Sequence, residues 1–114
     1  MDEALLTELA AQLADALWWA DEMDLSEGVC NHFSLTHESL AGGFLINPAG
    51  LHWLEVDPSD AVFCDPKAIS GGAYDAQVEV TALSIHRAIH ASRPSAAAVL
   101  HTHMPHATAL ACTS

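Results

Sequence analysis

The stretch Val99-Leu100-His101-Thr102-His103-Met104-Pro105 places two histidines two residues apart, after the apolar run Ala96-Ala97-Ala98. These residues predict a strand over 96–102, and side chains two apart on a strand lie on the same face. Both imidazoles would then lie close enough to share one ion, because histidine is a common metal ligand near neutral pH. The pair supplies two of the three protein ligands that a catalytic zinc site usually needs. The alternative is that both are polar loop residues or hydrogen-bonded, partly buried imidazoles.

The composition bounds the class of protein. The chain has 114 residues, which suits one domain, and 51% of them are hydrophobic, which is enough for a core. It carries 15 Asp and Glu against 3 Lys and Arg, for a net charge of -12. This balance argues against nucleic acid and anionic membranes as partners, because binding phosphate needs basic contacts. With only Lys67, Arg87 and Arg93 available, it also argues against a phosphorylated substrate.

The sequence predicts a cytoplasmic protein. Its first residues, Met1-Asp2-Glu3-Ala4, lack the basic region of a signal peptide. No apolar run approaches the roughly 20 residues that are needed to span a bilayer. The cysteines are odd in number and widely spaced, which predicts reduced, packed thiols at Cys30, Cys64 and Cys112.

Hydrophobic periodicity predicts an amphipathic helix over residues 2–23, with leucines recurring at three- and four-residue steps. Trp18 and Trp19 are adjacent, so one ring is expected to face the core and the other a loop or a partner. A second helix is predicted from Ala76 to Ala91, ended by Pro94. The apolar stripe expected on that second helix consists of Val80, Leu83, Ile85, Ala88 and Ile89.

Short strands separated by turn residues fill the rest of the chain. A loop over residues 28–32 leads into the first strand, Gly42-Gly43 forms a hairpin turn, and residues 65–75 form a glycine-containing loop. The predicted strands are Phe33–Thr36, Phe44–Ile46, Ala61–Cys64 and residues 96–102, and Pro105 starts a third helix that continues from His106 onward.

The element order is helix, three strands, helix, strand, helix, which predicts an α/β fold with a sheet covered by helices. The first strands are linked by hairpins and are therefore expected to be antiparallel. The chain stops at Ala111-Cys112-Thr113-Ser114 without a helix stop signal, which predicts an incomplete, N-terminal portion of a longer domain over residues 1–114. The alternative is a natively short domain with a frayed last turn.

Three motifs in order resemble one known family. The first is the loop Glu27-Gly28-Val29-Cys30-Asn31-His32-Phe33-Ser34, and the second is Phe44-Leu45-Ile46-Asn47-Pro48-Ala49-Gly50-Leu51. The third is a helix, Ile85 to Pro94, followed by Val99-Leu100-His101-Thr102-His103. Together they resemble the class II aldolase/adducin family over roughly residues 5–112.

The resemblance implies a three-layer α/β/α domain with a mainly antiparallel central sheet. Its enzymes are usually homotetramers that cleave or epimerise sugar phosphates with a divalent ion, generally zinc, with manganese and iron as alternatives. The implied metal ligands here are His101 and His103, and the third family histidine would lie beyond residue 114. The implied substrate-binding positions are Asn31, His32, Asn47 and Gly50.

The chain departs from the family pattern beside the implied metal site. Family aldolases have an acidic residue where this chain has Ala82, and Glu79 is the candidate catalytic replacement. The alternative for Glu79 is a solvated carboxylate at the helix start. The phosphate-binding residues also differ, at Asn31-His32, Ala49-Gly50 and Val80-Thr81. A protonated His32 would bind an anion, although a loop histidine beside a strand is more often structural.

Two functions follow as alternatives. One is a divalent-metal-dependent lyase that acts on a small hydroxy or oxo compound, by aldol cleavage or decarboxylation. The other is an adducin-like binding module that has kept the fold and lost catalysis. Metal affinity discriminates between them, because function belongs to the site and not to the fold.

Overall fold

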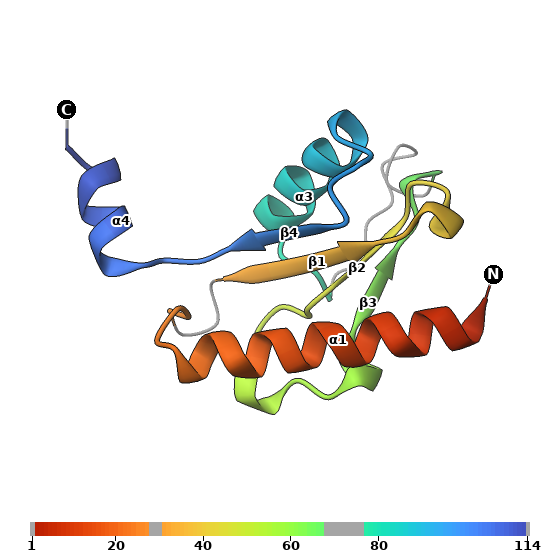
Figure 1. Cartoon of the computed structure of the whole chain (residues 1–114), viewed down its shortest axis with the longest axis horizontal. Coiled ribbons are helices and arrows are strands. Elements are labelled where there is room, and N and C mark those ends of the chain that lie inside the picture. Colours follow the sequence, from red (N-terminus) through yellow and green to blue (C-terminus); the bar gives the residue numbers. More distant parts are fainter. Residues whose placement is uncertain (1, 28–30, 68–76, 114) are drawn as a thin grey trace.

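The computed structural model describes residues 2–27, 31–67 and 77–113. Figure 1 shows a sheet with one long helix across one face and a shorter helix on the other. The predicted order of elements is confirmed, with short 3-10 turns added between the strands. In chain order, the helices and strands are α1 (Glu3–Glu22), β1 (His32–Thr36), β2 (Phe44–Ile46), β3 (Val62–Cys64), α3 (Val80–Ser92), β4 (Ala98–His101) and α4 (Pro105–Ala111).

The four strands form one sheet in the order β3-β2-β1-β4, and every neighbouring pair is antiparallel. The predicted antiparallel sheet is therefore confirmed. The turn between β1 and β2 is sharp because Gly42 has a φ of 89°, a left-handed backbone that glycine adopts without strain. Strand β4 joins β1 across the chain, pairing His32 with His101 and Ser34 with Val99. This register brings two motifs that are 69 residues apart into contact.

Helix α1 packs its leucine stripe on one face of the sheet. Asp2 begins the helix by accepting hydrogen bonds from the backbone of its first turn. Leu13 and Leu17 are almost fully buried, and they belong to one cluster with Phe33 and Trp53. The helix predicted from the leucine spacing is confirmed. The expectation for the tryptophans is wrong, because Trp18 and Trp19 are 43% and 61% exposed and neither ring enters the core.

Helix α3 covers the opposite face, and it differs from its prediction in two respects. It begins at Val80 and not at Ala76, because Glu79 has an extended backbone and its side chain caps the helix. Its buried side chains are Ala82, Leu83, His86 and His90, whereas Val80 and Ile85 of the expected stripe are exposed. The true stripe is half polar, so a hydrophobic pattern could not identify it.

The three layers are therefore α1, the sheet and α3, as the α/β/α prediction required. The apolar residues against α3 form a second, smaller cluster, in which Phe44 and Ile46 of β2 meet Val78, Ala82 and Leu83. Helix α4 lies apart from these layers in Figure 1 and buries no side chain among the described residues.

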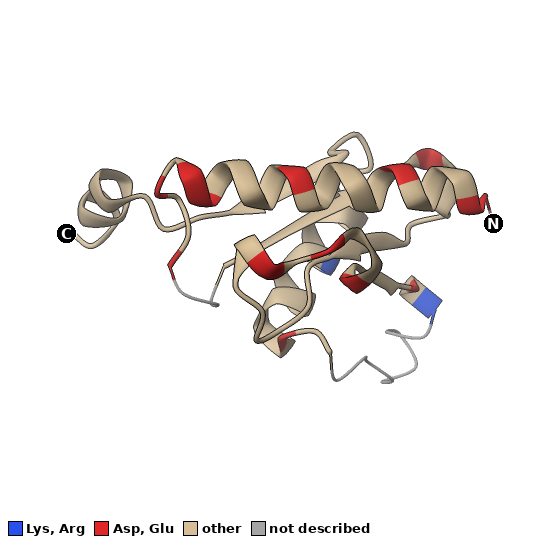
Figure 2. Ribbon diagram, turned by 90° about the horizontal axis from the view of Figure 1, so that it is seen from below, with Lys and Arg blue, Asp and Glu red and all other residues tan. Residues whose placement is uncertain are grey.

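Acidic residues are distributed along α1 and the loops, and basic residues are sparse (Figure 2). No helix in the described part of the chain is long and apolar enough to cross a bilayer. Of the cysteines, Cys64 is buried as expected, and Cys30 lies outside the described residues. The expectation of a packed thiol is wrong for Cys112, which is exposed near the end of α4. The predicted glycine-containing loop lies largely outside them as well.

Candidate functional site

A row of histidines lies between β1, β4 and α3. Strand β1 alternates its side chains, so Phe33 and Leu35 pack towards α1 while His32 and Ser34 point towards α3. On α3, His86 and His90 are one helical turn apart and both are buried against this side of β1.

These side chains form one continuous hydrogen-bonded chain. The Nδ1 atom of His101 lies 3.1 Å from Nε2 of His32, whose Nδ1 lies 2.7 Å from Nε2 of His86. The His86 Nδ1 lies 2.5 Å from the Ser34 hydroxyl, which lies 2.7 Å from Nε2 of His90. These five residues run from the sheet edge at β4 into the layer under α3. We call them the histidine chain, which consists of His101, His32, His86, Ser34 and His90.

Burial keeps the inner rings of the histidine chain neutral. Desolvation, followed by the neighbouring His101, lowers the pKa of His32 from 6.5 to about 4. Desolvation, followed by the neighbouring His32, lowers the pKa of His86 from 6.5 to about 3. Burial also lowers the pKa values of His90 and His101. At neutral pH each ring therefore carries one N–H donor and one lone pair.

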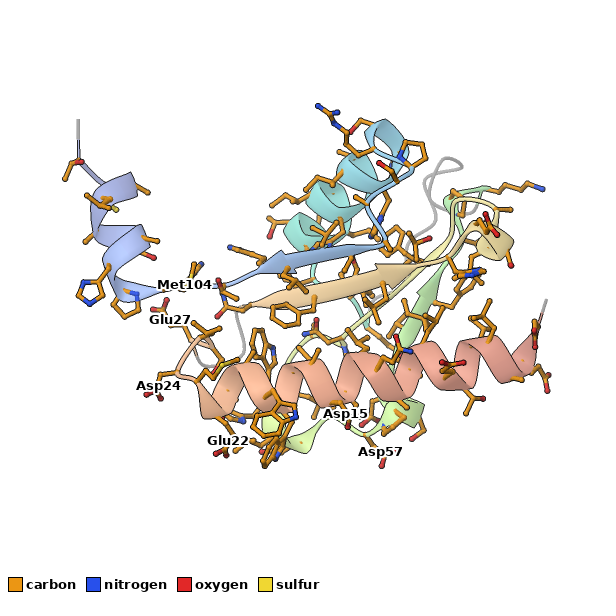
Figure 3. The ribbon with its side chains drawn as sticks, in the orientation of Figure 1. Asp15, Glu22, Asp24, Glu27, Asp57 and Met104 are labelled. Atoms are coloured by element: carbon orange, nitrogen blue, oxygen red, sulfur yellow. The ribbon has the colours of Figure 1, made fainter. Side chains whose placement is uncertain are left out.

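The two histidines of the predicted metal pair lie side by side, although not on one strand. Strand β4 ends at His101, and His103 follows it in the segment that leads to α4. The two ring centroids are 5.0 Å apart. The His103 Nδ1 is paired with the carboxylate of Glu27, which lies after α1. Figure 3 shows Glu27 close to Met104, at the junction between β4 and α4.

Two imidazoles are a partial metal centre. In the residues that the structure describes, no group of three His, Cys, Asp or Glu side chains is arranged to hold an ion. The donor chemistry nevertheless fits a divalent ion, because a metal-bound histidine usually gives its second N–H to a carboxylate or a carbonyl. Glu27 provides that partner for His103 and leaves its Nε2 lone pair available.

Asn31 and Asn47 connect the first two motifs. The Asn47 side chain accepts a hydrogen bond from the Phe33 backbone and donates one to the Asn31 carbonyl. The Trp53 indole donates to the same carbonyl. The Asn31 side-chain oxygen accepts from the Glu27 backbone, while its buried Nδ2 donor has no partner in the described parts of the chain. A small pocket beside it is lined by Asn31, His32, Asn47, Pro48, Ala49, Glu79 and Ala82.

Three of the four predicted substrate-binding residues, Asn31, His32 and Asn47, meet at this pocket. Gly50 is not among its lining residues, and it lies at an exposed turn with a φ of 82°. The roles of all four in binding substrate stay predictions.

The candidate catalytic residue Glu79 has a structural task. Its carboxylate accepts hydrogen bonds from the backbone of Thr81 and Ala82 and from the Thr81 hydroxyl, and these bonds lower its pKa. This geometry is that of the alternative, a carboxylate at the start of a helix. Glu79 also lines the pocket, so its role in catalysis stays a prediction.

The sequence reasoning did not identify Glu27, Ser34, His86 or His90 as parts of the site. A signal was present in the four-residue spacing of His86 and His90, which places both on one helix face. It could be recognised only together with the His32–Ser34 alternation on β1, because the partners are more than 50 residues apart.

Comparison with known proteins assigns the family. The profile described as "Class II Aldolase and Adducin N-terminal domain" matches residues 11–114. A 5-methylthioribulose-1-phosphate/5-deoxyribulose-1-phosphate aldolase from Rhodospirillum rubrum is 34% identical over 88% of this chain and 42% of its own length. Alpha-adducin from Rattus norvegicus is 32% identical over 91% of this chain and 14% of its own length.

A solved structure supports the same assignment. An aldolase II superfamily protein from Pseudomonas syringae superposes with a TM-score of 0.81 and 29% identity, over 95% of this chain and 43% of that one. This chain thus spans less than half the length of these three proteins. The profile match, the sequence relatives and the shared architecture agree with the three motifs, and the chain belongs to the class II aldolase and adducin family.

Proposed function

We propose that this chain forms part of a divalent-metal-dependent carbon–carbon lyase acting on a small hydroxy or oxo compound, by aldol cleavage or decarboxylation. The observation that carries the proposal is the side-by-side placement of His101 and His103, with the Nδ1 of His103 held by Glu27. In metal sites, the ring nitrogen of a histidine that does not bind the ion typically makes a hydrogen bond to another protein group, as Nδ1 does in both His101 and His103.

The residues divide the work as follows. A bound divalent ion, with zinc as the expected identity, supplies Lewis acidity that polarises a substrate carbonyl beside the bond that breaks. His101 and His103 hold that ion, and Glu27 keeps the His103 proton on Nδ1. The unpaired, buried Nδ2 of Asn31 gives the neighbouring pocket a hydrogen-bond donor for a substrate oxygen.

The pocket favours a substrate without a phosphate group. None of the described residues that line it is Lys or Arg, and the helix position next to His32 carries the small apolar Ala82. Glu79, which also lines the pocket, adds negative charge and would repel a phosphate. The aldolase from Rhodospirillum rubrum is named for phosphorylated substrates, so we propose that this chain differs from it in substrate class.

An adducin-like binding module is the second candidate. Ala82 favours it, because that residue provides no acid where the family's aldolases are expected to have one. The alpha-adducin relative is nearly as similar to this chain as the aldolase relative is. A homotetramer and a cytoplasmic location stay predictions under either candidate.

The lyase proposal is tested by turnover with small hydroxy acids, oxo acids and hydroxyaldehydes, each offered with and without a phosphate group. We expect cleavage of an unphosphorylated member, loss of activity with a chelator and recovery with zinc. His103→Ala should lose activity, whereas His106→Ala, an exposed histidine in α4, should keep it. Turnover that survives both the chelator and His103→Ala would rule out the proposed site. Tight zinc binding without turnover of any compound would favour the binding module.

A further inference from the structure

The histidine chain ends at a proposed metal ligand, and its hydrogen bonds constrain that ligand. His32 and His86 each use both ring nitrogens within the chain. A neutral imidazole has one donor and one acceptor, so a ring that accepts at one nitrogen must donate at the other. The protons of His101, His32 and His86 must therefore point in one direction, either away from His101 or towards it.

The ligand end of the histidine chain selects the direction. The Nδ1 atom of His101 lies against Nε2 of His32, so Nε2 is the nitrogen of His101 that the histidine chain leaves for an ion. A neutral imidazole that binds an ion through Nε2 carries its proton on Nδ1. His101 then donates that proton to His32. At the buried end, Nδ1 of His90 has no hydrogen-bond partner among the described residues, so that end selects neither direction.

From His101 the assignment follows ring by ring. His32 accepts at Nε2 from Nδ1–H of His101 and therefore donates from its own Nδ1 to Nε2 of His86. His86 then donates from Nδ1 to the Ser34 hydroxyl oxygen, which also lies within hydrogen-bond distance of Nε2 of His90.

Glu27 arranges the neighbouring ring of His103 in the same way. A carboxylate only accepts hydrogen bonds, so Glu27 fixes the proton of His103 on Nδ1 and leaves the Nε2 lone pair. The two neighbouring histidines thus present the same nitrogen. In the opposite direction, the His101 proton would lie on Nε2 and its Nδ1 lone pair would be occupied by His32, so this ring could bind no ion.

We infer that His32 is a positioning residue, which accepts the Nδ1 proton of His101 and thereby holds that ring with its Nε2 lone pair free for the ion. Behind it, His86, Ser34 and His90 fix the orientation of His32. This role rests on the proposed function, because binding of an ion to His101 is what fixes the direction of the protons, whereas the contacts between the rings are present without the ion. It gives His32 a purpose that differs from the anion binding expected of a protonated loop histidine.

The tautomer of His101 tests the inference directly. Two-bond ¹H–¹⁵N NMR spectra of the metal-free full chain at pH 7.5 identify which ring nitrogen carries the proton. We expect His101 to be protonated on Nδ1 in the wild type. His32→Phe should remove this preference, because it deletes the acceptor. His32→Gln, whose side-chain oxygen can replace Nε2 as acceptor, should restore it, and His106→Phe is the control. A wild-type His101 that is protonated on Nε2 would overturn the inference without any variant.

Zinc affinity, measured by competition with a chromophoric chelator, gives the second readout. Losing an outer partner of a metal-bound histidine typically weakens binding about 10–100-fold, and His32→Phe should fall in that range. Unchanged affinity in a folded His32→Phe would contradict the positioning role. A wild type that shows the expected tautomer but binds no zinc would support the proton arrangement and refute the proposed metal site, so the two failures are distinguishable.

Discussion

The two faces of the sheet bury different kinds of side chain, mainly apolar under α1 and partly polar under α3. The face under α1 is apolar, with Leu13 and Leu17 of the helix packed on Phe33 and Trp53. The face under α3 carries a smaller apolar cluster and, beside it, the buried histidine chain. The same strand, β1, contributes to both faces through its alternating side chains.

This difference in side chains separates the role of one face in stability from the role of the other in orienting side chains. Apolar packing is non-directional, so the α1 face stabilises the fold without specifying the orientation of any one group. A buried polar chain is directional and costly when it is incomplete, because each unpaired member loses its hydration without compensation. The histidine chain lies on the face that meets the proposed metal ligand His101. The predictions below break one face at a time.

The largest loss of stability is expected from the apolar face. Leu17 is fully buried in the cluster under α1, and Leu17→Ala should lower the free energy of unfolding by about 2–5 kcal/mol. Urea denaturation measures this loss, with the exposed Leu110→Ala of α4 as control. The His101 tautomer should not change. A changed tautomer at constant fold would show that the two faces are not independent.

The polar face should be less costly to break but should change the site. His86→Leu leaves His32 and Ser34 each without one buried partner, and the expected loss is about 1–3 kcal/mol. Arg87→Leu, the exposed neighbour on the same helix, is the matched control and should have little effect. The His101 tautomer should lose its preference in His86→Leu. If His86→Leu changes neither the free energy of unfolding nor the His101 tautomer, the histidine chain does not hold the His101 ring in place.

Acid should weaken the polar face selectively. The folded-state pKa values of His32 and His86 are lowered to about 4 and about 3, so the unfolded chain binds more protons below pH 6.5. Stability is therefore greatest above pH 6.5 and falls as the pH drops towards 4. Each ring would cost up to about 2 kcal/mol between pH 6.5 and pH 5.

Urea denaturation of the metal-free chain across this pH range measures the effect. The slope should shrink in His86→Leu and remain in Leu17→Ala. An equal slope in wild type and His86→Leu would mean that His86 is not kept neutral by burial.

The smallest expected effect concerns Glu79, at the start of α3. Removing its capping oxygens by Glu79→Ala should cost about 1 kcal/mol, while Glu79→Gln keeps an acceptor and should cost less. If Glu79 also acts in catalysis, Glu79→Gln will lower turnover with metal binding unchanged. Unchanged turnover would leave it a capping role alone.

The sequence predicts the apolar face well, because its signal is local. The leucines of α1 repeat at helical steps, and the short strands are separated by clear turn residues. The sequence pattern places the start of α3 too early, because it includes Glu79 in the helix, whereas Glu79 caps it. Hydrophobicity also selects Val80 and Ile85 for the buried stripe of α3, whereas the polar His86 and His90 are buried in their place.

The candidate site was only half predictable for a related reason. The His101–His103 pair is a local motif, and its two rings do lie together. The partners of those rings, His32 and Glu27, are 69 and 76 residues away in the chain, and only the β1–β4 register and the end of α1 bring them close. Periodicity within one segment carries no information about such contacts.

The most direct test of the metal-centre proposal is metal content. Elemental analysis of the full chain, purified without a chelator and then equilibrated with zinc, should find about one divalent ion per chain. His101→Ala and His103→Ala should each lose that ion while keeping a wild-type circular dichroism spectrum, and His106→Ala should retain it. A chain that holds no ion after exposure to zinc, manganese or iron would contradict the proposed metal centre.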